Sequence, residues 1–186
     1  LCLVVGLRDG SLVRELVQQS QLRVLAIDTD QKRVQQLRSE FQNSGIYGSR
    51  ITVRHVSSYQ PVPLIGHWAN LVVSESLLTT STPPCSATEM ARLIRPDGGQ
   101  VILGQPATGK TSLGVDDLNR WLGSLRSSAR VSTDPKQGTW ARLLRGPLDG
   151  SGDWSHLYGS ADNSSFAGEK LAGAKSASDL VVQWVG

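Results

Sequence analysis

The residues best placed to do chemistry are a glycine-bounded turn and an acid that follows it in the chain. The turn is Gly6–Gly10, and Asp28 lies 22 positions after its first glycine. A turn of this kind between a strand and a helix leaves backbone N–H groups bare at the helix N-terminus, and glycine lets a ligand approach closely. An acid at the tip of the next strand can accept hydrogen bonds from a ribose diol. Together they favour a nucleoside-containing cofactor.

Two observations restrict this reading. The dinucleotide pattern G-x-G-x-x-G is incomplete, because Arg8 stands at its second glycine and the third is missing. A nicotinamide-dependent enzyme is therefore disfavoured. Asp28 also has a plainer role open to it, since an acid between a strand and a helix often only caps the helix.

A second glycine-rich motif competes with the first. Residues 104–111 fit the phosphate-binding pattern G-x-x-x-x-G-K-[ST] after an expected strand. However, Gly114 and Asp116 indicate that the next helix begins later than this pattern requires. No later apolar strand ends in the Asp that would hold magnesium. We expect a glycine-rich loop here, with triphosphate binding as the weaker alternative.

The cysteines and histidines show no metal-site or disulfide spacing. Cys2 and Cys85 differ in setting, and His55, His67 and His156 are scattered, so we expect no metal centre.

Charge is unevenly distributed over the 186 residues, whose net charge is +3. Residues 146–186 hold two cations and five anions, which leaves +6 on residues 1–145. The cations are dispersed and no aromatic residues interleave with them, so nucleic-acid binding is disfavoured.

Apolar runs alternate with helical periodicity over the first 145 residues. The pattern predicts strands at 1–5, 23–27, 51–56, 69–73 and 100–103, and helices at 12–17, 31–44, 86–94 and 115–125. Two further strands, 129–132 and 139–144, are separated by turn residues and predict a hairpin. We expect a Rossmann-like, doubly wound α/β sheet of seven strands, mostly parallel, with an antiparallel hairpin at its C-terminal edge.

The composition changes after residue 145. Residues 146–186 contain seven glycines and seven serines and lack periodicity until the apolar run 180–185. We expect a domain over 1–145, and over 146–186 an acidic connector with the start of a truncated following domain.

The layout of residues 1–145 resembles the class I S-adenosylmethionine-dependent methyltransferases. The matching segments are a glycine loop, two strands, a strand-entry turn and the late hairpin, at 5–12, 24–28, 69–74, 96–103 and 129–144. The resemblance implies the strand order 3-2-1-4-5-7-6 and S-adenosylmethionine as cofactor. It places the methionine end along Gly6, Leu7, Arg8, Asp9 and Gly10, the ribose at Asp28 with Thr29, the adenine at Ser57 and Ser58, and Ser74 at the end of the fourth strand.

Three positions depart from that family's pattern. Val4 stands where the family usually has an acid, Arg8 where it has glycine, and Ser57 where it has another acid. Residues 74–77 show neither the Asn-Pro-Pro-Tyr motif of amino-group methylation nor a Pro-Cys nucleophile. We therefore assign no catalytic residue and no methyl acceptor. The resemblance implies a methyltransferase, and the departures support an alternative, a non-catalytic methyltransferase-like structural or docking module.

The tail carries a second resemblance. Residues 153–159, 161–165 and 180–186 are similar to the segment that precedes the first blade of pyrroloquinoline-quinone-type β-propellers, which implies a propeller partner in the parent chain. Since the chain opens on Leu1 in an apolar run, we interpret it as part of a longer protein. No run reaches the ~18 apolar residues of a membrane span. We expect a soluble protein, cytoplasmic by default and periplasmic if a missing N-terminal segment carries a signal.

Overall fold

The computed structural model describes residues 1–108, 113–153, 155–159, 161–170 and 175–179. It divides into two compact units, Leu1–Arg145 and Gly146–Gly186.

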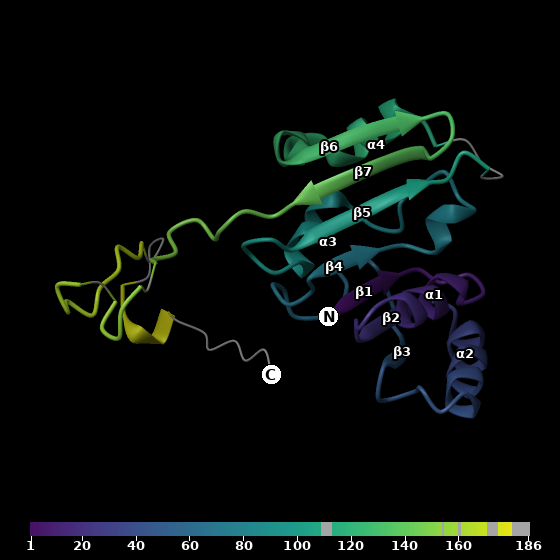
Figure 1. The fold of residues 1–186 in the computed structure, drawn as a ribbon, viewed down its shortest axis with the longest axis horizontal. Helices are drawn as coiled ribbons and strands as arrows, with labels where there is room; N and C mark the ends of the chain where they lie inside the picture. Colours follow the sequence, from purple (N-terminus) through teal and green to yellow (C-terminus); the bar gives the residue numbers. More distant parts are fainter. Residues whose placement is uncertain (109–112, 154, 160, 171–174, 180–186) are drawn as a thin grey trace. The chain divides into compact units, whose positions relative to one another are not determined.

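The first unit is built on one sheet of seven strands in the order β3-β2-β1-β4-β5-β7-β6 (Figure 1). The strands are β1 (Cys2–Val5), β2 (Val24–Asp28), β3 (Ile51–His55), β4 (Leu71–Val73), β5 (Gln100–Gln105), β6 (Ala129–Asp134) and β7 (Gly138–Leu144). The first five strands pair in parallel, and β7 pairs antiparallel with both β5 and β6. The predicted fold class and strand order are confirmed.

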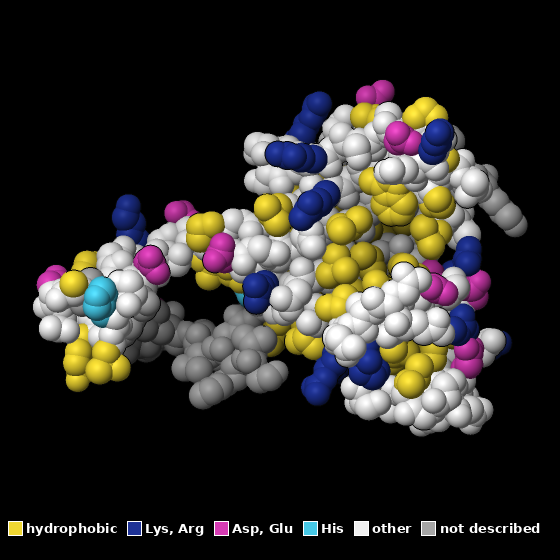
Figure 2. Space-filling view, in the orientation of Figure 1, with side chains coloured by type: hydrophobic (Ala, Val, Ile, Leu, Met, Phe, Trp, Pro, Cys, Tyr) yellow, Lys and Arg dark blue, Asp and Glu magenta, His cyan; other side chains and the backbone are white. Residues whose placement is uncertain are grey.

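Helices cover both faces of this sheet. They are α1 (Ser11–Gln19), α2 (Gln31–Asn43), α3 (Ala87–Leu93) and α4 (Val115–Leu122), with 3₁₀ turns η1 (Ser76–Leu78) and η2 (Gly123–Ser128). One core joins α1 and α2 to the sheet and the other joins α3 and α4 to its opposite face. Over β5 and β7, on the face that carries α1 and α2, Figure 2 shows hydrophobic side chains at the surface.

The central strand β1 explains why the fold forms from this sequence. All four of its residues are buried, because strands flank it and helices cover both of its faces. Alternate side chains of a strand point to opposite faces. Cys2 and Val4 accordingly enter the core under α1 and α2, whereas Leu3 and Val5 enter the core under α3 and α4.

Several element boundaries differ from the prediction by a few residues, and those of the fourth helix and β5 have clear physical reasons. The fourth helix ends at Leu122, before a short 3₁₀ turn that begins at Gly123 with φ of 52°. β5 extends to Gln105 because β7 pairs with it along its whole length.

The longer β5 bears on the phosphate-loop alternative. Gly104, the first glycine of that motif, lies within the strand opposite Trp140. A Cβ at Gly104 would approach the Trp140 ring to 2.6 Å, so packing in the sheet requires glycine there. The motif's Gly109, Lys110 and Thr111 lie outside the described residues.

The second unit is irregular where it is described. It contains a hydrogen bond from Lys170 N to Gly150 O at 2.9 Å, a short bridge between His156 and Gly159, and the 3₁₀ turn η3 (Ala177–Asp179). The predicted strand at 180–185 lies outside the described residues.

No helix among the described residues is long and apolar enough to cross a membrane. In the same part of the chain, no group of three or more His, Cys, Asp and Glu side chains could hold a metal ion.

Candidate functional site

The glycine turn and Asp28 meet at the carboxyl edge of the sheet. β1 and β2 pair in parallel, so the turn that leaves β1 lies beside the last residue of β2. The backbone N–H of Leu7 donates to Asp28 Oδ2 at 2.6 Å. The sequence-predicted acid and loop therefore form one hydrogen-bonded unit.

Asp28 is only 2% exposed, and its carboxylate is fully engaged within the protein. Oδ1 accepts from Asp30 N at 2.7 Å, and the Arg33 guanidinium lies 3.0 and 3.1 Å from the two oxygens. A carboxylate offers about four acceptor positions, so these contacts and the Leu7 bond occupy all of them. The helix α2 is capped by Asp30, whose Oδ1 accepts from Lys32 N and Arg33 N.

A second acid, Glu75, holds the glycine turn from the end of β4. Its side chain is completely buried, and in the part of the chain that the structure describes no basic side chain forms an ion pair with it. The carboxylate instead accepts hydrogen bonds of 2.9–3.1 Å from Arg8 N, Gly10 N, Ser11 Oγ and Leu12 N. These donors lie at the positive N-terminal end of α1, which stabilises a buried anion. The amides that the sequence assigned to a ligand are thus bound by Glu75.

The two glycines of the turn are required by packing. Gly6 and Gly10 both have φ of 77°, in the left-handed region that favours glycine. A Cβ at Gly6 would collide with Ser76 Oγ, and one at Gly10 would lie 2.8 Å from Leu37. In addition, Gly6 O accepts from Glu75 N and Ser76 N at 3.1 and 3.0 Å, which ties the turn to β4.

Arg8 and Asp9 place opposite charges side by side on the exposed rim of the turn. Their side chains form an ion pair of 2.9 Å, and Arg8 also donates to Ser11 Oγ at 3.2 Å. Hydrogen bonds from Ser11, with a smaller contribution from Arg8, lower the pKa of Asp9. Both charges are therefore present at neutral pH, and both are accessible.

The predicted adenine corner follows β3. Ser57 is exposed, whereas Ser58 Oγ closes a local turn with Gln60, accepting from its N–H and donating to its carbonyl. Beside them Tyr59 Oη accepts from Thr29 N at 3.2 Å. Burial, together with the negative charge of Asp28, raises the pKa of Tyr59 to about 12, so its hydroxyl stays protonated.

Ser74 lies beneath the turn. It is buried, and its hydroxyl accepts from Leu77 N at 3.3 Å and shares a hydrogen bond of 3.1 Å with Ser76 Oγ. These contacts start η1, so Ser74 shapes the chain around Glu75.

Sequence reasoning missed three residues that contact the predicted site: Arg33, Tyr59 and Glu75. Glu75 carried a signal, because an acid directly after a buried strand needs a partner. Arg33 carried one as well, since it lies five residues after Asp28 on a predicted helix. Tyr59 carried none, because only the fold brings it to Thr29.

The comparisons with known proteins agree with this geometry. The family model described as methyltransferase domain matches residues 3–102. No curated protein matches the sequence.

Solved structures share the fold at low sequence identity. A proposed S-adenosyl-L-methionine-dependent methyltransferase of Methanococcus maripaludis has a TM-score of 0.63 at 15% identity, covering 79% of this chain and 78% of its own. A SAM-dependent methyltransferase of Aquifex aeolicus has 0.53 at 15% identity, covering 77% and 79%. The branched-chain polyamine synthase of Thermus thermophilus has 0.56 at 12% identity, covering 79% and 52%. The fold thus also serves an enzyme named for polyamine synthesis.

Proposed function

This chain belongs to the methyltransferase domain family, and on that premise we propose that it binds S-adenosylmethionine at the carboxyl ends of β1 and β2 and serves methyl transfer. The single observation that carries the proposal is the hydrogen bond between Asp28 and Leu7 N. It fixes an acid at the end of β2 against the glycine turn. A ribose and the groups attached to it would contact the acid and the turn at the same time.

The ribose would bind Asp28 in place of Arg33. Arg33 contacts Asp28 through a partly exposed side chain, and its contacts reach both carboxylate oxygens. If Arg33 turns toward solvent, one acceptor position opens on each oxygen, which suits the two hydroxyls of a vicinal diol. The hydrogen bonds from the backbone amides of Leu7 and Asp30 would still hold the carboxylate in place.

The methionine end would bind the charged rim of the turn. Since the amides of Arg8 and Gly10 donate to Glu75, we assign the zwitterion to the side chains on the rim of the turn. The Arg8 guanidinium suits the carboxylate of the amino acid, and the Asp9 carboxylate suits its ammonium. In this proposal Gly6, Leu7 and Gly10 give the turn its shape.

The adenine would lie at the corner formed by Thr29, Ser57 and Ser58, with Tyr59 beside it. Ser74 belongs to the proposed site because its hydrogen bonds to Ser76 and Leu77 shape the chain on either side of Glu75. When bound, S-adenosylmethionine supplies an electrophilic methyl group. The chain's own contribution would be to orient donor and acceptor, which needs no dedicated acid or base.

Titration calorimetry with S-adenosylmethionine and S-adenosylhomocysteine tests the proposal. We expect measurable binding of both ligands and a loss of about tenfold or more in affinity for Asp28→Asn, because a neutral amide is a weaker acceptor for the ribose diol. No binding heat and no thermal shift at millimolar ligand would contradict the proposal.

A second candidate function, a non-catalytic methyltransferase-like module, is favoured by one specific observation. The Asp28 carboxylate and the backbone amides of Leu7, Arg8, Gly10 and Leu12 already have partners within the protein. A domain of this kind keeps its shape without a cofactor. It would be the correct reading if neither ligand binds to the wild-type chain or to an Arg33 variant.

For the remaining organisation we propose a methyltransferase-like domain over 1–145 followed by a connector. The acidic, glycine- and serine-rich composition of 146–186 supports the connector, and its resemblance to a propeller lead-in supports a propeller as the following domain. Sequencing the parent gene on both sides of this segment tests both statements.

A further inference from the structure

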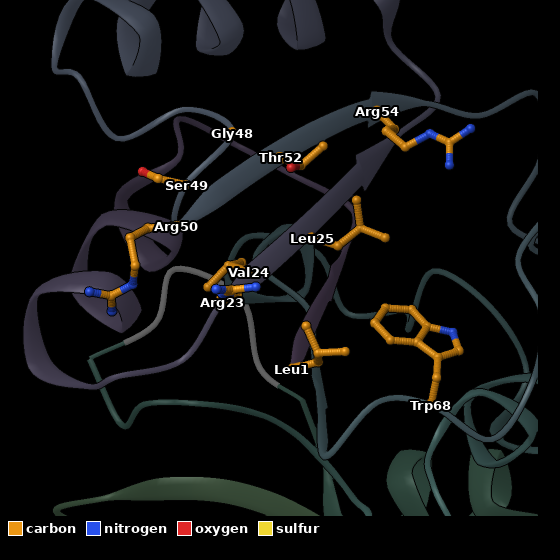
Figure 3. A pocket seen from close by; sticks show the side chains of 10 residues that line it. All are labelled: Leu1, Arg23, Val24, Leu25, Gly48, Ser49, Arg50, Thr52, Arg54 and Trp68. Atoms are coloured by element: carbon orange, nitrogen blue, oxygen red, sulfur yellow. The ribbon is translucent and has the colours of Figure 1, made fainter. Parts of the chain in front are cut away.

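A cavity of about 360 Å³ lies away from the proposed cofactor site, at the beginning of β2 and β3 (Figure 3). Its lining includes Arg23, Leu25, Arg50, Thr52, Arg54 and Trp68. The glycine turn and Asp28, by contrast, follow the last residues of β1 and β2. The cavity is therefore a separate feature, and a ligand could bind there whether or not the proposed function is correct.

The register of β2 and β3 gives this cavity an apolar floor with a cation at each end. Leu25 and Thr52 are direct partners across the two strands. Because alternate residues share a face, Arg23 lies on the same face before Leu25, and Arg54 lies on it after Thr52. Figure 3 shows the two guanidinium groups on either side of Leu25, with the Trp68 indole forming the wall next to it.

The lining carries positive charge without compensation. Arg50 donates to the carbonyl oxygens of Val17, Ser20 and Leu22, and it pairs with no carboxylate among the described residues. No hydrogen bond or ion pair of the Arg23 and Arg54 side chains is present among the residues that the structure describes. In the same described part of the chain no Asp or Glu lines the cavity. The site therefore attracts anions.

We propose that this cavity binds a planar aromatic anion of the size of a nucleoside monophosphate. The Trp68 indole and Leu25 offer apolar surface for a ring. A guanidinium is a planar fork that matches phosphate or carboxylate oxygens in two hydrogen bonds. The cavity volume lies within the range of small-molecule sites, about 300–1,000 Å³. Thr52 adds a hydroxyl on the floor.

Adenosine monophosphate is the probe, with its two halves as references. Calorimetric titration of the full chain is expected to give a Kd for adenosine monophosphate about tenfold or more below the values for adenosine and for inorganic phosphate. The double variant Arg23→Met, Arg54→Met should reduce this affinity to that of adenosine. Trp68→Leu should reduce it to that of phosphate.

Two control variants locate the binding. Arg130→Met removes an exposed arginine on β6 and should leave the affinity unchanged. Lys136→Met removes an exposed lysine between β6 and β7 and should also leave it unchanged. If Trp68→Leu does not fold by circular dichroism, the double arginine variant, whose changes are on exposed side chains, decides alone.

A second titration identifies the source of the nucleotide. If a single-stranded oligoadenylate binds more tightly per site than the monophosphate, the ligand of the cavity is a single-stranded nucleic acid. If the two affinities are equal, the ligand is a free nucleotide. The proposal is overturned if adenosine monophosphate binds no better than phosphate, or if the double arginine variant binds it normally.

Discussion

The Arg33 guanidinium bridges both carboxylate oxygens of Asp28, at 3.0 and 3.1 Å, from one turn inside α2. It neutralises a nearly buried charge and at the same time takes the acceptor positions that a ribose would need. The same residue therefore stabilises the folded domain and opposes the ligand that we propose for it. Its removal should move stability and affinity in opposite directions.

Arg33→Met should raise the affinity for S-adenosylhomocysteine by about threefold to tenfold, equivalent to about 1 kcal/mol, because Asp28 no longer has to exchange one partner for another. The same variant should unfold at lower urea concentration, since Asp28 is left with less compensation for its buried charge. Calorimetry and urea titration measure the two effects.

Lys32→Met is the matched control for this experiment. Lys32 precedes Arg33 on α2, is exposed, and makes no side-chain contact with Asp28. Its loss should leave both affinity and stability nearly unchanged. If Arg33→Met binds the ligand as the wild type does, Arg33 does not compete for Asp28. If neither protein binds it, the proposed function is wrong.

Glu75→Gln should lower the free energy of unfolding by about 3 kcal/mol. A glutamine amide presents N–H groups to a turn whose three backbone partners are all donors, and some of these donors would lose their acceptor. Equilibrium urea unfolding measures the change. Glu15→Gln is the control, because Glu15 is an exposed acid on α1 whose side chain accepts from Gln19, and it should change stability little. Equal effects of the two variants would contradict this account of Glu75.

Gly104→Ala should destabilise the first unit by about 2 kcal/mol or more, because its Cβ would press into Trp140. Gly146→Ala is the control, since a Cβ there meets nothing within 4 Å. Thermal unfolding followed by circular dichroism compares the two. The phosphate-loop interpretation would be supported instead if Gly104→Ala left the stability unchanged and if the protein bound ATP in a way that Lys110→Ala removes.

Glu89 should make stability depend on pH. Hydrogen bonds from Arg92 hold the pKa of Glu89 below its usual value of 4.5, and the same carboxylate accepts from Val62 N at 2.7 Å. Because the pKa of Glu89 is lower in the folded state than in the unfolded state, the ionised carboxylate stabilises the fold. This stabilisation is complete above the unfolded-state pKa and is lost as the pH falls through the folded-state pKa. Glu89→Gln should therefore cost about 1 kcal/mol at neutral pH and less below about pH 4. Urea titrations of the wild type and the variant at several pH values measure the difference in their free energies of unfolding. A difference that stays constant with pH would contradict the role given to the ionised Glu89.

The fold could be predicted because each strand is a short apolar run with a clear end. Cys2–Val5 stops at a glycine, Val24–Asp28 at an acid, and the late hairpin at Asp134 and Gly138. These are local signals. The end of β5 was missed because pairing with β7 extends the strand through Gly104, which alone favours a turn.

The site could be predicted only in its outline. Asp28 and the glycine turn were visible because parallel strands bring their carboxyl ends together. The partners of those residues were not, because Glu75 reaches the turn across more than 60 residues of chain, from β4 on the other side of β1. A contact of that kind depends on strand order and on burial, and neither is encoded in local spacing.

The carboxylate of Glu75 has a consequence for the history of this domain. Since the turn is braced by a side chain of the same chain, its shape does not require an occupant. Mutations that erase affinity for a donor molecule would leave folding intact, and selection for a stable scaffold would not remove them. The loss of activity, and equally its recovery, would therefore proceed through a few exposed charges such as Arg8 and Asp9 while the buried framework stays the same.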